Sequence, residues 1–315
     1  MNTNALRVPE CLIWAMMAVC FIGGELYSQG DSCLSRKTVI TVANSAPIEG
    51  LTAADFRVTV GGKATAVQSV VPEDRSPRVI ILIDASASQD QSTWAVTQAI
   101  AEEFLAGFPD AGDFTLLAFD DKIQRVVHES NRGALQGALG EMFPSGKRES
   151  AAGLAEAVKK AGASLDRYRQ GDAEFLITTS DQTSKETTQA LSQQRATGIR
   201  LFGVSFDQST HPAPLPFDVY MTVEDYSPLG AAAKASGGRW IWFDMSRQNA
   251  TATLQSARTS GRTAATMVRN YFTLDLRLDK PLVKPEKLKI ELIKGTRIDA
   301  KDISMSYPQE LFPCQ

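Results

Sequence analysis

Residues Arg78 to Ser88 read RVIILIDASAS, and this stretch decides the fold predicted for the chain. Val79 to Ile83 is an unbroken β-branched and aliphatic run, which is typical of a strand buried on both faces of a sheet. Asp84, Ser86 and Ser88 then place one carboxylate and two hydroxyls at alternating positions before a predicted helix. In open α/β sheets the ligand crevice lies beyond the carboxyl ends of the strands. Oxygen donors at this place favour Mg²⁺, Mn²⁺ or Ca²⁺ over zinc or copper.

Strand-like runs alternate with segments of helical period through the middle of the chain. This alternation predicts an α/β fold with a doubly wound, mostly parallel sheet. The further strands of this sheet are predicted at 114–119, 174–179, 199–206 and 239–243, with packing helices that include 91–108 and 249–268. Thr183 and Glu186 have the spacing of a capping box for the helix that ends before Gly198.

Alternating strands precede and follow this region. Strands are predicted at 38–42, 56–60 and 64–71 on one side and at 271–278, 287–293 and 303–307 on the other. Neither group has enough strands to be stable alone, so we expect them to pair into one small β-sandwich. The predicted organisation is a leader at 1–30, the two halves of the sandwich at 31–76 and 270–315, and an inserted α/β domain at 77–269.

The Asp84-x-Ser86-x-Ser88 pattern after a buried strand resembles the metal-ion-dependent adhesion site (MIDAS) of von Willebrand factor type A domains, which have a Rossmann-like fold. Ser180-Asp181-Gln182, at the end of a later strand, is similar to the Thr-Asp-Gly of that family. The resemblance implies that Asp84, Ser86 and Ser88 form the inner part of a Mg²⁺ site, with Mn²⁺ or Ca²⁺ as substitutes. Asp181 would bind the ion through water, and a partner carboxylate would fill the open coordination position.

One position departs from that family. The family usually has Gly-Thr-x-Leu-x-x-Ala at the start of the next helix, and the threonine hydroxyl completes the metal shell. Leu154 and Ala157 align with this pattern, but Ala152 stands at the threonine position. Ser150 is the nearest hydroxyl and is the substitute ligand that this alignment offers.

A second resemblance involves the segment before the α/β domain. Leu51, Asp55, Phe56 and Gly62-Lys63 are in register with a "gLtaeDFxvxxdGk" segment. That segment precedes the type A domain in a bacterial family of exported von Willebrand factor A-related proteins that is abundant in Acidobacteria. The resemblance then covers nearly the whole chain after the leader.

The amino terminus predicts export. Cys11 to Gly24 is an uncharged run, too short to span a bilayer comfortably but of the size of a signal-peptide core. Ser28 and Gly30 supply small residues for cleavage near Asp31, which would leave a periplasmic or secreted protein without a membrane span. An uncleaved amino-terminal anchor is the competing interpretation, and lipid attachment at Cys20 or Cys33 matches its pattern poorly.

Cys33 and Cys314 are the two cysteines after the leader, and they lie at the ends of that part of the chain. In an oxidising compartment a disulfide between them would close almost the whole chain into one loop. The chain-entropy model gives such a bridge on the order of 4 to 5 kcal/mol. Two free thiols at frayed termini are the alternative.

Composition and motifs exclude several functions. The formal net charge is −3, and no basic stripe predicts nucleic-acid binding. Gly-x-Ser-x-Gly, His-Glu-x-x-His, Cys-x-x-Cys and P-loop patterns are missing from the sequence. His128 and His211 are the only histidines, and they are expected on an edge strand and a proline-rich loop.

The sequence therefore predicts a non-enzymatic protein-binding or adhesion module that recognises a partner carboxylate through a bound divalent cation. Two alternatives stay open. The fold could serve as a metal-free binding scaffold, in which Asp84 only orders its loop. The protein could also be an envelope structural or assembly component that makes its main contact through the β-sandwich.

Overall fold

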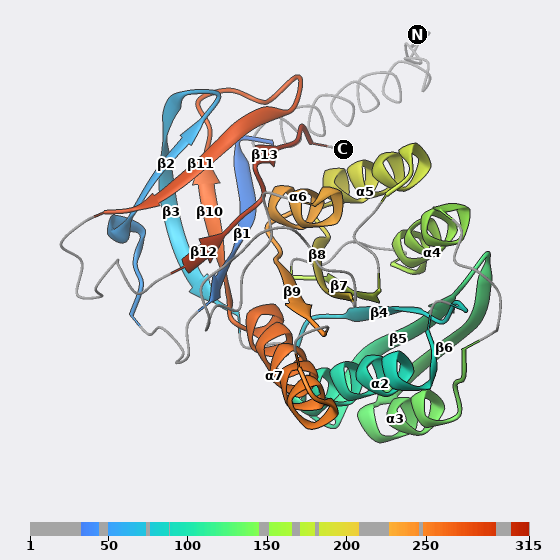
Figure 1. The fold of residues 1–315 in the computed structure, drawn as a ribbon. Coiled ribbons are helices and arrows are strands. Elements are labelled where there is room, and N and C mark those ends of the chain that lie inside the picture. Colours follow the sequence, from blue (N-terminus) through green and yellow to red (C-terminus); the bar gives the residue numbers. More distant parts are fainter. Residues whose placement is uncertain are drawn as a thin grey trace, which may run out of the picture.

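The computed structural model describes residues 33–43, 50–73, 76–87, 89–144, 151–165, 171–179, 183–207, 227–245, 248–293 and 304–314. Two sheets organise them, one of six strands and one of seven (Figure 1). The predicted leader at 1–30 lies outside the described residues, as do residues 208–226 of the proline-rich loop predicted at 207–228. Among the described residues no helix has the length and apolar character needed to cross a membrane.

The six-stranded sheet has the strand order β6-β5-β4-β7-β8-β9. All its neighbouring strands are parallel except the edge pair β5 and β6, which is antiparallel. The prediction of a mostly parallel sheet is therefore confirmed. Its strands are β4 (Val79–Asp84), β5 (Ala111–Phe119), β6 (Ile123–Asn131), β7 (Ala173–Thr178), β8 (Arg200–Asp207) and β9 (Trp240–Asp244).

Helices cover both faces of this sheet, because β4 is apolar on both sides. Ile81 and Ile83 lie in the core cluster on the face covered by α2 (Gln91–Ala106), α3 (Arg132–Gly140) and α7 (Ala250–Arg269). Ile80 and Leu82 lie in the cluster on the face covered by α4 (Ala151–Ser164), α5 (Lys185–Thr197) and α6 (Pro228–Ala235). Every residue of β4 is buried, as the unbroken apolar run predicts.

Side-chain caps set where two of these helices begin. The carboxylate of Asp90 accepts a hydrogen bond from the backbone N–H of Thr93 (2.8 Å) at the start of α2. The cap of α5 is Ser184, whose hydroxyl accepts the Thr187 N–H at 3.0 Å. The predicted capping box that begins at Thr183 is thus wrong by one residue. Both positions carry a hydroxyl, so the local pattern alone did not separate them.

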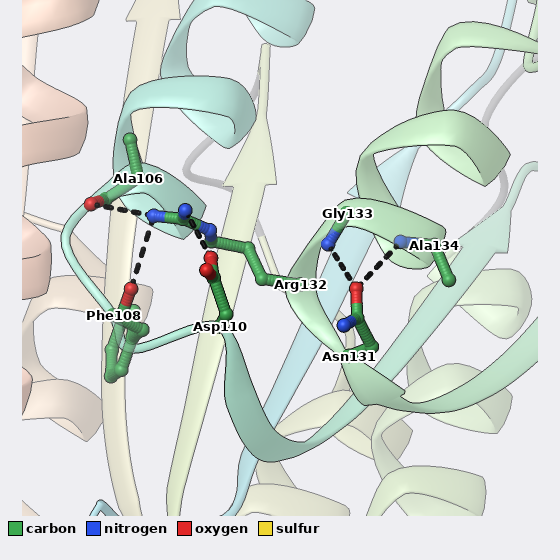
Figure 2. Close-up of polar contacts among 7 residues, drawn as sticks. All are labelled: Ala106, Phe108, Asp110, Asn131, Arg132, Gly133 and Ala134. Carbon is green, nitrogen blue, oxygen red and sulfur yellow. Dashed lines mark hydrogen bonds and ion pairs between the residues drawn. The ribbon is translucent and has the colours of Figure 1, made fainter.

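The start of α3 is fastened to the connection between α2 and β5 (Figure 2). Asn131 caps α3 by accepting the backbone N–H groups two and three residues on, at 2.7 and 3.2 Å. The guanidinium of Arg132 donates to the carbonyl oxygens of Ala106 (3.3 Å) and Phe108 (3.2 Å) and pairs with Asp110. These bonds lie at the end of the sheet where β5 begins.

The seven-stranded sheet combines strands from both ends of the chain, in the order β12-β1-β10-β3-β2-β11-β13. All pairs of neighbouring strands in this sheet are antiparallel, including β1 and β10, where Thr38 lies opposite Leu274. The strands are β1 (Ser35–Ala43), β2 (Phe56–Val60), β3 (Lys63–Pro72), β10 (Tyr271–Arg277), β11 (Glu286–Leu292), β12 (Ser304–Ser306) and β13 (Glu310–Leu311), and a 3₁₀ turn, Ala53–Asp55, precedes β2.

This sheet is strongly curled, because its two edge strands are close neighbours in the sequence. Between Ser306 of β12 and Glu310 of β13 the chain spans at most ~14 Å. In a flat seven-stranded sheet the two edges would be ~29 Å apart. Ile40 of β1 and Ile290 of β11 accordingly share one core cluster. The predicted β-sandwich is confirmed in part: both termini supply the strands, but the strand order is continuous through β3.

The disulfide predicted between Cys33 and Cys314 is present, with their Cα atoms 5.8 Å apart. The bond joins the segment just before β1 to the segment just after β13. The guanidinium of Arg36 adds a hydrogen bond to the carbonyl oxygen of Phe312 (2.7 Å). The covalent bond therefore fastens β1, which lies next to one edge of the curled sheet, to β13 at the other edge.

The curled sheet packs against the edge of the six-stranded sheet where the parallel strands begin, which we call the amino edge (Figure 1). Arg200, the first residue of β8, is fully buried there. Its guanidinium donates to Thr41 Oγ1 of β1 (3.0 Å) and to the carbonyl oxygens of Gly171 (2.7 Å) and Val268 (3.0 Å). It also lies 4.4 Å from the centre of the Tyr271 ring. The opposite edge, where these strands end, is called the carboxyl edge.

Candidate functional site

The candidate site lies at the carboxyl edge and is built around Asp84, the last residue of β4. This side chain is fully buried. Its Oδ1 accepts the backbone N–H of Ser86 at 2.9 Å, and its Oδ2 accepts the hydroxyl of Thr179 at 3.3 Å. Thr179 directly follows β7, the neighbour of β4 in the sheet. Two adjacent strand ends therefore bring a carboxylate and hydroxyl groups together.

Burial raises the pKa of Asp84 above its ordinary value, because the carboxylate is removed from water. Hydrogen bonds from the hydroxyl and backbone N–H groups of Ser86 and Thr179 lower the pKa and offset part of this effect. Within the described part of the chain, no Lys, Arg or His forms an ion pair with Asp84. The negative charge is thus held by neutral donors alone, an environment that favours a bound cation.

Hydrogen bonds from Gln89 hold the loop after β4 in place. Gln89 is buried, and its amide nitrogen donates to the Asp84 carbonyl at 3.0 Å while its amide oxygen accepts the Thr97 hydroxyl at 3.0 Å. The Gln89 N–H also donates to the Ser86 carbonyl at 3.0 Å, which closes a tight turn. Asp90 caps α2, and hydrogen bonds from Thr93 lower its pKa, so it serves the helix.

The neighbouring strand end brings α4 to the same edge. Asp120 follows β5 and is fully buried, and its Oδ1 accepts the Lys122 N–H at 3.0 Å within the turn to β6. A Cβ atom on Gly153 would lie 1.9 Å from the Asp120 carbonyl oxygen. Glycine at this position lets the first turn of α4 contact the β5–β6 turn directly. The start of α4 is the place where the sequence resemblance expects a hydroxyl ligand.

The structure brings together only part of the predicted ligand set. Asp84 and Ser86 adjoin each other, whereas Ser88, Ser150 and Asp181 lie outside the described residues. Ala152 falls in the first turn of α4, but its side chain is not among those described. No group of three or more His, Cys, Asp or Glu side chains suited to a metal occurs within the described ranges. The ligand assignment therefore stays a prediction.

The donors that are described fit a hard divalent cation. Asp84, Ser86 and Thr179 offer only oxygen atoms, which suit Mg²⁺, Mn²⁺ or Ca²⁺. A cation bound beside Asp84 would supply a Lewis-acidic position that a carboxylate ligand could fill. Gln89 holds the backbone at this place through its hydrogen bonds to the carbonyl oxygens of Asp84 and Ser86.

Sequence reasoning missed two residues that shape this site. Thr179 supplies a hydroxyl to Asp84, and its place at a strand end next to Asp181 was the signal that could have found it. Gln89 had no comparable signal, because its role depends on the turn that only the folded chain shows. His128 is on the edge strand β6, as expected, with its Nδ1 2.8 Å from Thr115 Oγ1. His211 lies outside the described residues.

Together, the doubly wound sheet and the oxygen donors beyond its central strand define a Rossmann-like α/β domain with oxygen donors at its carboxyl edge, where open α/β sheets bind their ligands. Residues 79–216 match the family model of the von Willebrand factor type A domain. The chain thus contains a von Willebrand factor type A domain. None of the curated proteins compared with it matches the chain.

Several solved structures are similar to the chain. A von Willebrand factor type A protein from Catenulispora acidiphila has 10% identity and a TM-score of 0.44, covering 89% of this chain and 72% of that one. The conserved hypothetical protein BatB from Bacteroides thetaiotaomicron has 16% identity and a TM-score of 0.43, with 60% and 99% covered. Proximal thread matrix protein 1 from the mussel byssus, with a zinc-occupied MIDAS motif, has 12% identity and a TM-score of 0.41, with 62% and 49% covered.

Proposed function

We propose that this protein is an exported, non-enzymatic protein-binding module that recognises a carboxylate of its partner through a divalent cation. The observation that supports this proposal best is the environment of Asp84. Its carboxylate is buried at the carboxyl edge and, in the described structure, is surrounded by neutral oxygen and nitrogen donors. A cation at this place would relieve the cost of burying the charge and would lie where ligands of open α/β sheets bind.

In this proposal Asp84, Ser86 and Ser88 form the inner part of the site, and Asp181 acts through a water molecule. Ser150 is the substitute for the hydroxyl that Ala152 lacks. Mg²⁺ is the expected ion, with Mn²⁺ or Ca²⁺ as alternatives, because all these donors are oxygen atoms. An open coordination position would then accept the partner carboxylate.

The proposal also covers the organisation of the chain. Residues 77–269 would form an inserted domain between the sandwich halves 31–76 and 270–315, after removal of a leader at 1–30. The Cys33–Cys314 disulfide supports export, because such bonds persist in oxidising compartments. Membership of the acidobacterial-type exported family would follow from the segment around Leu51 and Phe56.

Isothermal titration of the purified protein with Mg²⁺ and Mn²⁺ tests the cation site. Saturable binding is expected for the unaltered protein and is expected to be lost in Asp84→Ala. Asp279→Ala is a matched control, because it removes the same charge from an exposed position next to β10. No binding heat and no change in melting temperature with either ion would overturn the proposal.

A second candidate function is a metal-free binding scaffold or envelope assembly component. One specific observation favours it: each carboxylate oxygen of Asp84 already accepts a hydrogen bond from the protein. Asp84 would then order the loop between β4 and α2, and the curled sheet would make the main contact. In that case Asp84→Ala would lower stability while partner capture by the purified protein would not depend on divalent cations.

A further inference from the structure

A second concave site lies far from Asp84, where the curled sheet meets α5 and α6. It is a pocket of about 540 Å³ lined by the ends of these helices, by β11 and by the segment that joins β12 to β13. Figure 1 shows α5 and α6 beside β13. The ion pair between Arg195 and Glu310 (2.6 Å) joins α5 to β13, and the Gln309 N–H donates to the Ala235 carbonyl at the end of α6 (3.1 Å). The volume falls in the range of pockets that bind small molecules.

The lining of this pocket is strongly basic. Arg195, Lys234, Lys287 and Lys289 contribute four cations from three separate elements, whereas Glu310 is the one acidic residue among its lining residues. The chain as a whole has more acidic than basic residues, 36 against 33. Composition therefore does not account for this concentration of positive charge. A concave surface of one sign raises the local concentration of oppositely charged ligands.

Only two of the four cations that line the pocket lie at helix ends. Arg195 and Lys234 lie in the last turns of α5 and α6, where the helix dipole favours positive charge. The helix dipole does not explain the positions of Lys287 and Lys289, because both lie on a strand. They are two residues apart on β11, so both exposed side chains point to the same face.

Existing ion pairs leave positive charge in the pocket. Glu310 pairs with Arg195, and Lys289 pairs with Glu291 at 2.7 Å. Glu310 also lies opposite Lys287 in the β11–β13 ladder, so one carboxylate stands between two cations. Among the described residues no ion pair is formed by Lys287. On the far side of the same segment, an adjoining pocket of about 430 Å³ is lined by Arg36 and Lys37.

From this arrangement we infer that the pocket binds a small polyanion, a molecule or group with at least two negative charges of phosphate or carboxylate type. Lys287 and Lys289 from β11 contact one side of the ligand, and Lys234 and Arg195 contact the other. The ligand lowers the repulsion between the cations of the pocket. This site is at the amino edge of the six-stranded sheet, so it is independent of the proposed cation site.

Isothermal titration with inorganic pyrophosphate and with citrate tests the inference and separates phosphate from carboxylate ligands. The protein is first freed of divalent cations, because both probes chelate them, and is kept near 0.01 M ionic strength, where the Debye length is about 30 Å. Saturable binding of at least one probe is expected, and it weakens as salt is added. The double variant Lys287→Gln/Lys289→Gln is expected to bind about tenfold more weakly.

Lys280→Gln/Lys284→Gln is the matched control, since it removes two exposed lysines from the loop before β11. This control is expected to bind as the unaltered protein does. Failure of both probes to bind saturably would overturn the inference. An equal loss of affinity in the control and in the β11 variant would also overturn it, because binding would then depend on net charge alone.

Discussion

Two buried aspartates at opposite edges of the six-stranded sheet show how differently the chain treats a buried charge. Asp172 directly precedes β7 at the amino edge, and Arg78 directly precedes β4 beside it. The guanidinium of Arg78 donates to both carboxylate oxygens of Asp172, at 3.1 and 2.6 Å. Asp84 ends β4 at the carboxyl edge, where its described partners are the neutral groups of Ser86 and Thr179.

The amino and carboxyl edges of the six-stranded sheet therefore differ in how a buried carboxylate is balanced. At the amino edge the chain supplies its own cations, Arg78 and Arg200, and the curled sheet packs against this edge. At the carboxyl edge the carboxylate has no described cation from the protein, which is the arrangement expected of a ligand site. One edge holds the molecule together, and the other is where we propose that an ion binds.

The largest expected effect concerns the bond that closes the curled sheet on the amino edge. Replacing both cysteines, Cys33→Ser/Cys314→Ser, frees a loop with a sequence separation of 281 residues. For this separation the chain-entropy model predicts a loss of about 5 to 6 kcal/mol in the free energy of unfolding. Urea denaturation measures it. A loss below about 1 kcal/mol would show that packing alone closes the sheet.

Breaking the buried ion pair tests the amino edge itself. Arg78→Met leaves the Asp172 carboxylate buried without its cation and is expected to cost about 3 to 5 kcal/mol. The double variant Arg78→Met/Asp172→Asn should recover part of this loss, because a neutral pair carries no uncompensated charge. Urea denaturation of these two variants, of Asp172→Asn alone and of the unaltered protein forms a double-mutant cycle. If the losses in the free energy of unfolding were additive, Arg78 and Asp172 would not be coupled, and the ion pair would not stabilise this edge.

At the carboxyl edge, the corresponding test is the addition of an ion. Mg²⁺ at a hundredfold above its dissociation constant is expected to stabilise the protein by about 2.7 kcal/mol, and Asp84→Asn should abolish this gain. Burial raises the folded-state pKa of Asp84, so its contribution to stability is lost as pH rises above the unfolded value. Without metal, Asp84→Asn should therefore be at least as stable as the unaltered protein at neutral pH. Thermal unfolding with and without Mg²⁺ measures both effects.

The smallest effect per step of the measurement, about 1.4 kcal/mol for each pH unit, comes from a third buried carboxylate, which lies in the helix-covered core. Glu174 is fully buried; its Oε1 accepts the Gln194 amide at 2.6 Å, and its Oε2 has no hydrogen-bond partner among the described residues. Burial raises its pKa from 4.5 to about 8. The folded state therefore holds a proton that the unfolded chain releases between pH 4.5 and about 8.

Stability should fall across this window by about 1.4 kcal/mol per pH unit, and should not fall further from this group above it. Glu174→Gln, which stays neutral, is expected to remove that slope. Urea denaturation at several pH values compares the two proteins. The same pH slope in both would show that Glu174 does not titrate in this way.

The sequence predicted the central features because they are local. Val79 to Ile83 is apolar at every position, so a strand formed by these residues must be covered on both faces. Asp84 and Ser86 follow directly, so their place at the carboxyl edge was also predictable. The two cysteines needed only the expectation that the ends of the chain meet.

Features that depend on tertiary contacts were not predictable. The choice of Ser184 over Thr183 as a cap depends on where the chain leaves β7 and enters α5. The continuous order of the curled sheet depends on how the short segment between β12 and β13 connects its two edges. Gln89 supports the site through hydrogen bonds to Asp84 and Thr97, and no sequence pattern predicts these bonds.

The most direct test of the central claim is a crystal structure of the protein grown with saturating Mn²⁺, with anomalous difference density measured at the manganese edge. One peak is expected beside Asp84, about 2.2 Å from Ser86 Oγ, the distance typical of oxygen ligands to such cations. A map that shows ordered side chains for Asp84 and Ser86 but no anomalous peak between them would contradict the account.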